Sequence, residues 1–315
     1  MPDPFVRQDT AAFLAYLNAQ PGPKTHELDP VEARAMMRGM GNVADMPVGE
    51  LAVIRDVACP GPAGDVPLRL FDARAGRAAG PAVIFFHGGG FVFGDLDTHA
   101  PLCAEIARVL DLPVIAVDYR LAPEHPFPAA PDDCEAVARW VASSPAALGL
   151  DVTGLVLAGD SAGGSLAIVT ALALRDVPAD RPVIAQWPIY PAVSEATQYA
   201  SFAQFGDGYL LTAEGMDYFH RAYGADLTHW RGAPLLADQT GMPPTLVVTA
   251  SLDPLRDQGR AYAAATTLAG VPTVYREAAG AIHGFVNLRR AIPSASEDIA
   301  ACLAQLKLML GEAQA

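Results

Sequence analysis

The sequence has few cysteines, few basic residues and no visible cluster of metal ligands. Its four cysteines are far apart and form no Cys-x-x-Cys pair; they are Cys59, Cys103, Cys134 and Cys302. This spacing argues against a disulfide framework and against a zinc site, and we expect no bound metal. The 21 lysines and arginines are outnumbered by 35 acidic residues, which gives a net charge of −14. Because nucleic acids are bound by clustered basic residues, we expect no nucleic-acid partner.

Long apolar runs are absent as well. No stretch approaches the roughly 20 apolar residues of a membrane-spanning helix. The N-terminal segment MPDPFVRQDT lacks the apolar centre of a signal peptide. The excess of acidic residues also disfavours anionic membrane surfaces. These absences predict a soluble, cytoplasmic protein with no membrane partner.

What the sequence does contain is an alternation of apolar strands and helical stretches, in 49–190 and again in 241–315. Continuous apolar runs are typical of parallel strands covered on both faces. The alternation therefore predicts one α/β domain with a mostly parallel, eight-stranded sheet and helices on both faces. The expected strands are 51–58, 66–72, 82–86, 113–118, 154–158, 183–187, 245–250 and 273–277. The expected helices are 97–110, 132–142, 162–175, 254–269 and 295–310.

Two regions do not follow this alternation. The first, 1–48, holds two short predicted helices, 10–20 and 30–40, the second with Asp29 as its N-cap. The second region, 191–240, lies between two strands and is rich in aromatic residues. An insertion of this length favours a lid or a binding element over a structureless loop.

Gly159, Ser161 and Gly163 form a Gly-x-Ser-x-Gly pattern between a predicted strand and an apolar helix. Small residues let the backbone turn sharply there and expose the serine hydroxyl at the edge of the sheet, as in a nucleophile elbow. The N-terminus of the following helix favours negative charge that develops beside it. The alternative is an ordinary glycine-rich helix start with a capping serine. In its context, the pattern predicts Ser161 as a nucleophile.

The segment HGGGF, residues 87–91, also follows a predicted strand. Consecutive glycines let backbone N–H groups approach a ligand, and this kind of loop forms the oxyanion hole of esterases. A phosphate cradle is the alternative, but the Lys-Ser/Thr of a P-loop is missing. We assign the oxyanion donors to the N–H groups of Gly88, Gly89 and Ala162, and a structural role to His87.

The base and the acid are expected after Ser161, because the order in this type of fold is serine, acid, histidine. His283 follows the last predicted strand and precedes the last helix, which is the position that this order requires. Asp253 closely follows the predicted strand 245–250 and is the expected acid, although it would equally serve as a helix N-cap. Glu277 and Asp257 are weaker candidates, since one lies within a strand and the other within a helix.

Five motifs occur together in one order over residues 80–290: HGGGF, DYRLAPEHPFPAA, GDSAGG, DPLRDQG and HGF. In this combination the chain resembles the bacterial hormone-sensitive-lipase-like carboxylesterases. The resemblance implies an α/β-hydrolase fold, a helical cap built from 1–48 and 191–240, and ester hydrolysis without a cofactor. The segment REAAGAIHGF departs from the aromatic-rich pattern that is commoner before the histidine, which leaves the local pocket shape open.

These observations predict a carboxylesterase that hydrolyses short-chain esters through an acyl-enzyme. An acyltransferase or an amide or lactone hydrolase would use the same three residues, because one fold hosts many reactions. A non-catalytic receptor of the same fold is a remote alternative, since such receptors lack the histidine that His283 provides here. Besides a small ester, the expected partner is a second copy of the chain, paired through the edge strand 273–277.

Bulky side chains from the two irregular regions are expected to roof the site and limit substrate size. Trp187 and Tyr190 end a central strand and either line the site or pack in the core. Asp160 is expected to hold the serine turn and the glycine loop together. The candidate substrate contacts are Phe13, Tyr16, Trp187, Tyr190, Phe202, Phe205 and Tyr209.

Overall fold

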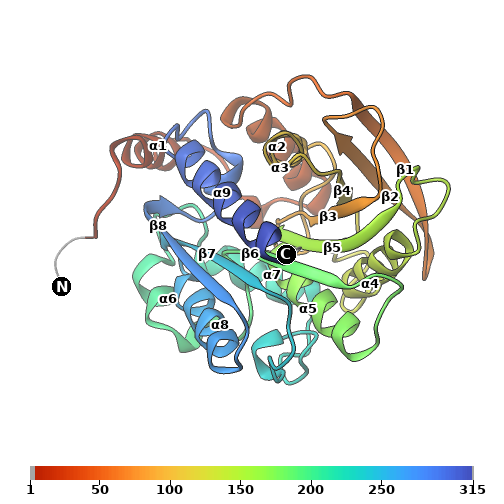
Figure 1. Ribbon diagram of the computed structural model, residues 1–315. Coiled ribbons are helices and arrows are strands. Elements are labelled where there is room, and N and C mark those ends of the chain that lie inside the picture. Colours follow the sequence, from red (N-terminus) through yellow and green to blue (C-terminus); the bar gives the residue numbers. More distant parts are fainter. Residues whose placement is uncertain (1–3, 314–315) are drawn as a thin grey trace.

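The computed structural model describes residues 4–313 and contains one twisted sheet with helices on both faces (Figure 1). Within these residues, eight strands are arranged in the order β1-β2-β4-β3-β5-β6-β7-β8. The bounds are β1 Val53–Gly61, β2 Gly64–Asp72, β3 Gly80–Phe86, β4 Val114–Val117, β5 Val152–Asp160, β6 Val183–Ile189, β7 Thr245–Leu252 and β8 Thr273–Ile282. Strand β2 runs antiparallel to both of its neighbours, β1 and β4, and all the other strand pairs within these residues are parallel. The predicted mostly parallel, eight-stranded sheet is confirmed.

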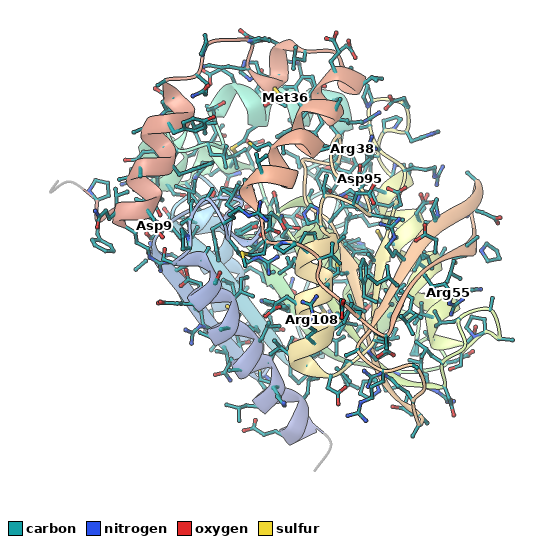
Figure 2. All side chains as sticks on the ribbon, turned by 90° about the horizontal axis from the view of Figure 1, so that it is seen from above. Asp9, Met36, Arg38, Arg55, Asp95 and Arg108 are labelled. Atoms are coloured by element: carbon teal, nitrogen blue, oxygen red, sulfur yellow. The ribbon has the colours of Figure 1, made fainter. Side chains whose placement is uncertain are left out.

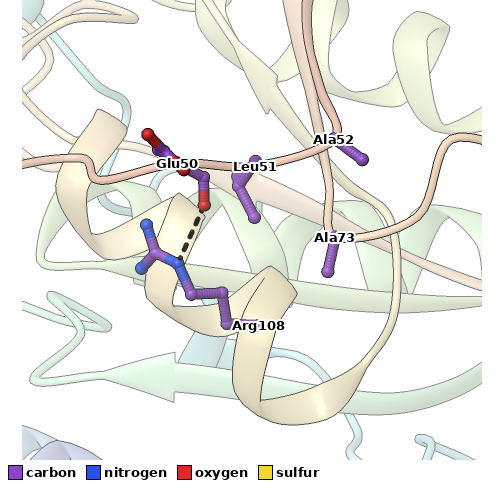
Figure 3. Close-up of a pocket in the computed structure, with 5 residues that line it drawn as sticks. All are labelled: Glu50, Leu51, Ala52, Ala73 and Arg108. Carbon is purple, nitrogen blue, oxygen red and sulfur yellow. Dashed lines mark hydrogen bonds between the residues drawn. The ribbon is translucent and has the colours of Figure 1, made fainter.

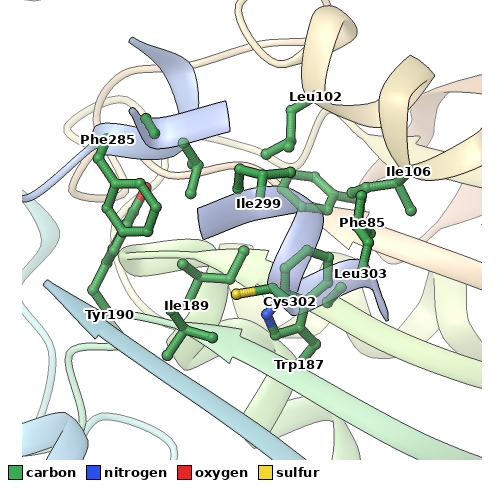
Figure 4. Close-up of a cluster of buried hydrophobic side chains, with 14 of the residues drawn as sticks. Phe85, Leu102, Ile106, Trp187, Ile189, Tyr190, Phe285, Ile299, Cys302 and Leu303 are labelled. Atoms are coloured by element: carbon green, nitrogen blue, oxygen red, sulfur yellow. The ribbon is translucent and has the colours of Figure 1, made fainter. Parts of the chain in front are cut away.

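The sheet divides the core into two layers, because side chains alternate along each strand and helices cover both faces. On β3, Val83 and Phe85 enter the layer under α3 and α9, whereas Ala82, Ile84 and Phe86 enter the layer under α4, α5 and α8. Figure 4 shows part of the first layer, where α9 covers the sheet. The bounds are α3 Ala100–Leu110, α4 Ala129–Ala142, α5 Ala162–Asp176, α8 Arg256–Leu268 and α9 Ala295–Ala313.

Strand β8 and helix α4 differ from their predicted bounds. β8 continues to Ile282, five residues beyond the expected range, because its small residues keep pairing with β7 as far as Leu252. Helix α4 begins at Ala129 with Pro128 at the N-cap position. The helix predicted over 132–142 therefore starts three residues earlier than expected. β8 lies at the sheet edge as expected, and pairing of two chains there stays a prediction.

The two irregular regions contribute α1 (Gln8–Asn18), α2 (Pro30–Ala44), α6 (Ala200–Phe205) and α7 (Ala213–Tyr223). They contact each other: the short 3-10 helix Thr25–Glu27 packs against α7, and Asn18 Nδ2 donates to the carbonyl of Gly208 (3.2 Å). Asp29 caps α2 as predicted, because its carboxylate accepts the N–H groups of the first turn. Across residues 4–313, no helix combines the length and the apolar character that crossing a bilayer requires.

Helix α2 is held to the sheet domain at both ends. Near its start, Arg34 donates to the carbonyl of Val92 (2.8 Å), and one turn later Arg38 pairs with Asp95 (Figure 2). Just past its end, Asp45 accepts two hydrogen bonds from the guanidinium of Arg289, at 2.7 and 2.9 Å. Both Asp45 and Arg289 are buried. The helix therefore bridges the loop after β3 and the loop after β8.

Removing one partner of the buried Asp45–Arg289 pair should cost much more stability than removing one partner of an exposed pair. Asp45→Ala leaves a buried guanidinium without its counter-charge, so we expect the free energy of unfolding to fall by about 3–5 kcal/mol. The matched control is Asp217→Ala, which breaks the exposed Asp217–Arg221 pair on α7 and should cost less than about 1 kcal/mol. Urea denaturation measures both, and equal losses would contradict the expectation.

Candidate active site

The turn between β5 and α5 places Ser161 at the edge of the sheet where the parallel strands end. Ser161 has φ 55° and ψ −118°, and its N–H donates to the carbonyl of Ile189 (2.8 Å). The two flanking glycines are required by close backbone contact. A Cβ on Gly163 would lie 1.9 Å from the carbonyl oxygen of Phe86, and a Cβ on Gly159 would lie 2.4 Å from the oxygen of Gly163. The strand-turn-helix context expected from the sequence is present.

His283 and Asp253 meet Ser161 from the ends of β8 and β7. His283 Nε2 lies 2.9 Å from Ser161 Oγ, and His283 Nδ1 lies 2.7 Å from Asp253 Oδ2. Asp253 is completely buried and His283 is 8% exposed. The other oxygen of Asp253 accepts the N–H of Leu255 (2.7 Å), so the carboxylate also serves the local turn before α8. The structure thus brings together the three residues that sequence order selected.

The two weaker acid candidates point elsewhere. Glu277 pairs with the guanidinium of Arg260 (2.7 Å). Asp257 pairs with Arg256 (2.8 Å) and accepts the N–H of Ser201 (3.0 Å). Both carboxylates already have cationic partners, so the geometry favours Asp253 as the partner of His283.

The glycine loop differs from its expected arrangement at Gly88. The Gly88 N–H donates to Asp160 Oδ1 (2.8 Å) and is therefore committed to a buried carboxylate. Among residues 4–313, by contrast, the N–H groups of Gly89, Gly90 and Ala162 have no hydrogen-bond acceptor. Gly89 and Gly90 have φ of 121° and 61°, which a side chain would strain. The expected role of the Gly88 N–H as an oxyanion donor is corrected, and the free N–H of Gly90 is a candidate donor that the sequence analysis missed.

Asp160 lies beneath this loop as a buried carboxylate. Burial acts to raise the pKa of Asp160, but the neighbouring His99 and the N–H of Gly88 outweigh it and hold the pKa below its usual value. The hydroxyl of Tyr190 also donates to Asp160 (3.3 Å). These contacts join the serine turn to the glycine loop, as the sequence analysis expected of Asp160.

His87, the first residue of the loop, is fully enclosed. Its ring stacks on Tyr119 with centroids 4.3 Å apart, and Nδ1 lies 2.8 Å from the carbonyl oxygen of Gly88. Burial disfavours the charged ring and lowers the pKa of His87 to about 4. A neutral imidazole donates from Nδ1 to Gly88 and fixes the start of the loop, which agrees with the expected structural role.

Several expected substrate contacts lie away from the site. Trp187 is completely buried under α9, next to Phe85 and Cys302, so it packs in the core (Figure 4). Tyr190 is also completely buried, behind His283, with ring centroids 4.5 Å apart. Phe13 is buried in the same core cluster as Trp187, and Tyr16 is 65% exposed to solvent. These values contradict the expected substrate contacts of Trp187, Tyr190 and Phe13, whose side chains are enclosed by the protein, and that of Tyr16, whose ring lies open to solvent.

The 191–240 region does approach the site, but through residues partly different from those expected. Phe205 is buried against Tyr209 and the guanidinium of Arg256, and Phe202 is half-buried. Leu210 comes close to the histidine loop, since its Cδ2 lies 3.6 Å from the Cβ position on Gly284.

Phe219 on α7 was missed by the sequence analysis. Its ring packs on Gly90, where a Cβ would lie 2.4 Å from the ring. One turn later, the ring of Tyr223 stacks on Phe91 with centroids 3.8 Å apart. Their spacing of four residues on one helix face was the sequence signal that could have predicted this contact. Through these two rings, α7 packs over the glycine loop.

A hollow of about 370 Å³ lies elsewhere on the surface (Figure 3). It is lined by Glu50, Leu51, Ala52, Ala73 and Arg108, none of which belongs to the Ser161 site. Among residues 4–313, no group of three or more His, Cys, Asp or Glu side chains is arranged to hold a metal ion.

Comparisons with known proteins place this geometry among hydrolases. Residues 83–287 match the α/β hydrolase fold family. The chain is 40% identical over 271 residues to the carboxylic ester hydrolase LipN of Mycobacterium tuberculosis, covering 82% of this chain and 71% of LipN. It is 35% identical over 308 residues to the ethyl acetate hydrolase of Pseudomonas putida, covering 93% and 96%. A crystal structure of an α/β hydrolase enzyme from the metagenome of Lake Arreo superposes with a TM-score of 0.90 at 36% identity, covering 97% of this chain and 99% of that one.

The low pKa of His87 predicts a specific loss of stability in acid. Because the folded chain disfavours the charged ring, His87 binds its proton more readily when unfolded, and stability falls as the pH drops from about 6.5 to about 4. Over this window, wild type should lose about 3 kcal/mol more than His87→Asn, which keeps a donor for the Gly88 carbonyl but does not titrate. Urea denaturation at pH 7.5 and pH 4 measures the difference. The exposed His125→Ala should follow wild type, and parallel curves for wild type and His87→Asn would refute the prediction.

Proposed function

This chain belongs to the α/β-hydrolase family and is a serine carboxylic-ester hydrolase, and on that premise we propose that it hydrolyses short-chain esters through Ser161, His283 and Asp253. The observation that carries the proposal is the continuous contact from Ser161 Oγ to His283 Nε2 (2.9 Å) and from His283 Nδ1 to Asp253 Oδ2 (2.7 Å). A nucleophile, a base within hydrogen-bond reach and a group that orients the base are the parts that acyl transfer requires.

The proton positions follow from the chemistry of the three groups. An ionised carboxylate only accepts hydrogen bonds, so Asp253 keeps the hydrogen of His283 on Nδ1. The lone pair of Nε2 then faces Ser161 Oγ and takes its proton as the oxygen attacks the ester carbonyl. When the tetrahedral intermediate collapses, His283 returns this proton to the leaving alcohol. Water then attacks the acyl-enzyme by the same route and releases the acid.

The negative charge of the tetrahedral intermediate needs donors that are held in place beforehand. We assign this role to the N–H groups of Gly89, Gly90 and Ala162. Ala162 is the first residue of α5, so its N–H also carries the positive end of the helix dipole. Gly88 supports these donors indirectly, since its own N–H is bound to Asp160.

Residues 1–48 and 191–240 act as a cap over this centre in our proposal. Phe219 lies on Gly90, and Leu210 lies beside Gly284, so apolar side chains of the second region border the glycine loop and the histidine loop. Bulky groups at both positions leave little room for a long acyl chain. Among the relatives, the ethyl acetate hydrolase of Pseudomonas putida is named for a small ester, which agrees with this preference.

The nucleophile assignment is tested by Ser161→Ala. Wild type should hydrolyse p-nitrophenyl acetate and carry a single phosphonate adduct on Ser161 after treatment with a fluorophosphonate. The variant should fold, lose turnover by about 10⁴-fold or more, and remain unlabelled. Intact-mass and peptide mass spectrometry locate the adduct, and Ser296→Ala on the exposed first turn of α9 serves as the matched control. An adduct on another serine, or an active Ser161→Ala protein, would disprove the assignment.

The size preference is tested with esters that differ only in acyl length. Wild type should show a higher kcat/KM for acetyl than for hexanoyl p-nitrophenyl esters, because Phe219 and Leu210 restrict the space near Ser161. Phe219→Ala should raise the hexanoyl-to-acetyl ratio by about tenfold, since the removed ring opens an apolar space beside the loop. Tyr16→Ala changes an exposed aromatic and should leave the ratio unchanged. A wild-type preference for palmitoyl over butyryl esters would count against the cap.

A further inference from the structure

His99 is a buried histidine that the proposed reaction does not use. It lies in the loop between β3 and α3, immediately before α3 begins, and is 6% exposed. Its ring packs near His87, with centroids 5.6 Å apart, and near Phe85, with centroids 6.0 Å apart. A buried imidazole needs partners for both nitrogens, so its contacts are informative.

Its Nε2 atom contacts three separate segments of the chain. Asp160 Oδ1 lies 3.0 Å away, Asn287 Nδ2 lies 2.9 Å away, and the backbone nitrogen of Gly88 lies 3.3 Å away. The other ring nitrogen, Nδ1, lies 3.0 Å from Thr98 Oγ1, which fixes the ring plane. Because Asp160 is ionised and only accepts, Nε2 carries a hydrogen that points to this carboxylate. The Gly88 N–H is then a neighbouring donor, and its acceptor is Asp160 Oδ1 (2.8 Å) and not the imidazole.

Asn287 can share this hydrogen. Its Oδ1 is buried and has no hydrogen-bond partner among residues 4–313. Turning the side-chain amide by a half rotation places that oxygen against His99 Nε2, where it accepts. Asn287 then links the imidazole to the histidine loop, since its backbone N–H donates to the carbonyl of Gly284 (3.0 Å).

Each of these three segments bears one part of the proposed machinery. Asp160 directly precedes Ser161, Gly88 directly precedes the donors Gly89 and Gly90, and Asn287 follows His283 by four residues in the short 3-10 helix after it. In sequence these segments lie far apart, and His99 is in direct contact with all of them.

We propose that His99 is a positioning residue that fixes the nucleophile turn and the histidine loop relative to one another through its Nε2–H group, and reaches the oxyanion loop through Asp160, which also accepts the Gly88 N–H. The inference rests on the proposed function, since it concerns how that site is held. His99 does not contact the ester or the reacting atoms. Its effect is on the distance between the oxyanion donors and His283, and a shift of about 1 Å in such a distance lowers the rate by roughly 100-fold.

The role depends on one atom, which allows a matched pair of substitutions. In His99→Gln, the terminal amide reaches the place of Nε2 and can donate to Asp160. In His99→Asn, the shorter amide reaches only the place of Nδ1 and faces Thr98. Both replacements are polar, but Asn has one methylene fewer than Gln, so the packing loss of each variant is measured separately as its change in urea stability.

The experiment measures kcat and KM for p-nitrophenyl acetate together with urea stability. His99→Asn and His99→Ala should lower kcat by roughly 10- to 100-fold with KM within about twofold of wild type, whereas His99→Gln should keep kcat within about fivefold. Asn287→Ala should lower kcat less than His99→Ala. The double variant should be no worse than His99→Ala, because the effect of Asn287 passes through the ring. His125→Ala, an exposed histidine, is the control.

Three results would overturn the proposal: equal kcat for the Gln and Asn variants, a loss confined to KM, or additive effects of His99→Ala and Asn287→Ala. If His99→Ala does not fold, the Gln–Asn comparison and Asn287→Ala alone decide between the outcomes. Failure of the proposed function is seen separately, as wild type without ester turnover or Ser161→Ala with it. The His99 variants are therefore compared with a wild type that turns over the ester and that loses this turnover in Ser161→Ala.

Discussion

The buried carboxylate of Asp160 is the constraint on which the arrangement of the site depends. A charge removed from water must be paired and hydrogen-bonded, or it costs several kcal/mol. Asp160 meets this requirement by accepting from Gly88 and Tyr190 and by facing His99. The same bonds hold the glycine loop beside the turn at Ser161 and place the ring of Tyr190 behind His283. Satisfying one buried charge therefore brings the parts of the site into their mutual positions.

The buried ion pair between Asp45 and Arg289 connects the N-terminal region to the loops around the site. Asp45 and Arg289 join the end of α2 to the loop after His283, while Arg34 and Arg38 join its first half to the segment after the glycine loop. Helix α2 thus connects the segment after the glycine loop to the loop after His283. The region that the sequence analysis assigned to a cap therefore also holds these two segments in place, because its polar contacts reach both of them.

The predictable part of the protein is the part encoded by local pattern. Continuous apolar runs identified the central strands, and alternation with helices identified a parallel sheet, because such strands are covered on both faces. The order of the motifs then selected Ser161, Asp253 and His283. All three follow strand ends, and the carboxyl ends of parallel strands lie at one edge of the sheet. That edge brings the three side chains within hydrogen-bond distance in the structure.

By itself, then, the sequence determined the sheet, the serine turn and the identities of three residues, since each is expressed in neighbouring residues or in chain order. Tertiary structure alone decided which glycine N–H groups stay free, that Trp187 and Tyr190 pack inside, and that Phe219 lies on Gly90. The sequence of three consecutive glycines does not indicate which N–H binds a distant carboxylate. An aromatic residue at a strand end is equally compatible with the core and with a pocket. These outcomes depend on contacts between residues far apart in the chain, such as the 72 positions between Gly88 and Asp160, and no local pattern records them.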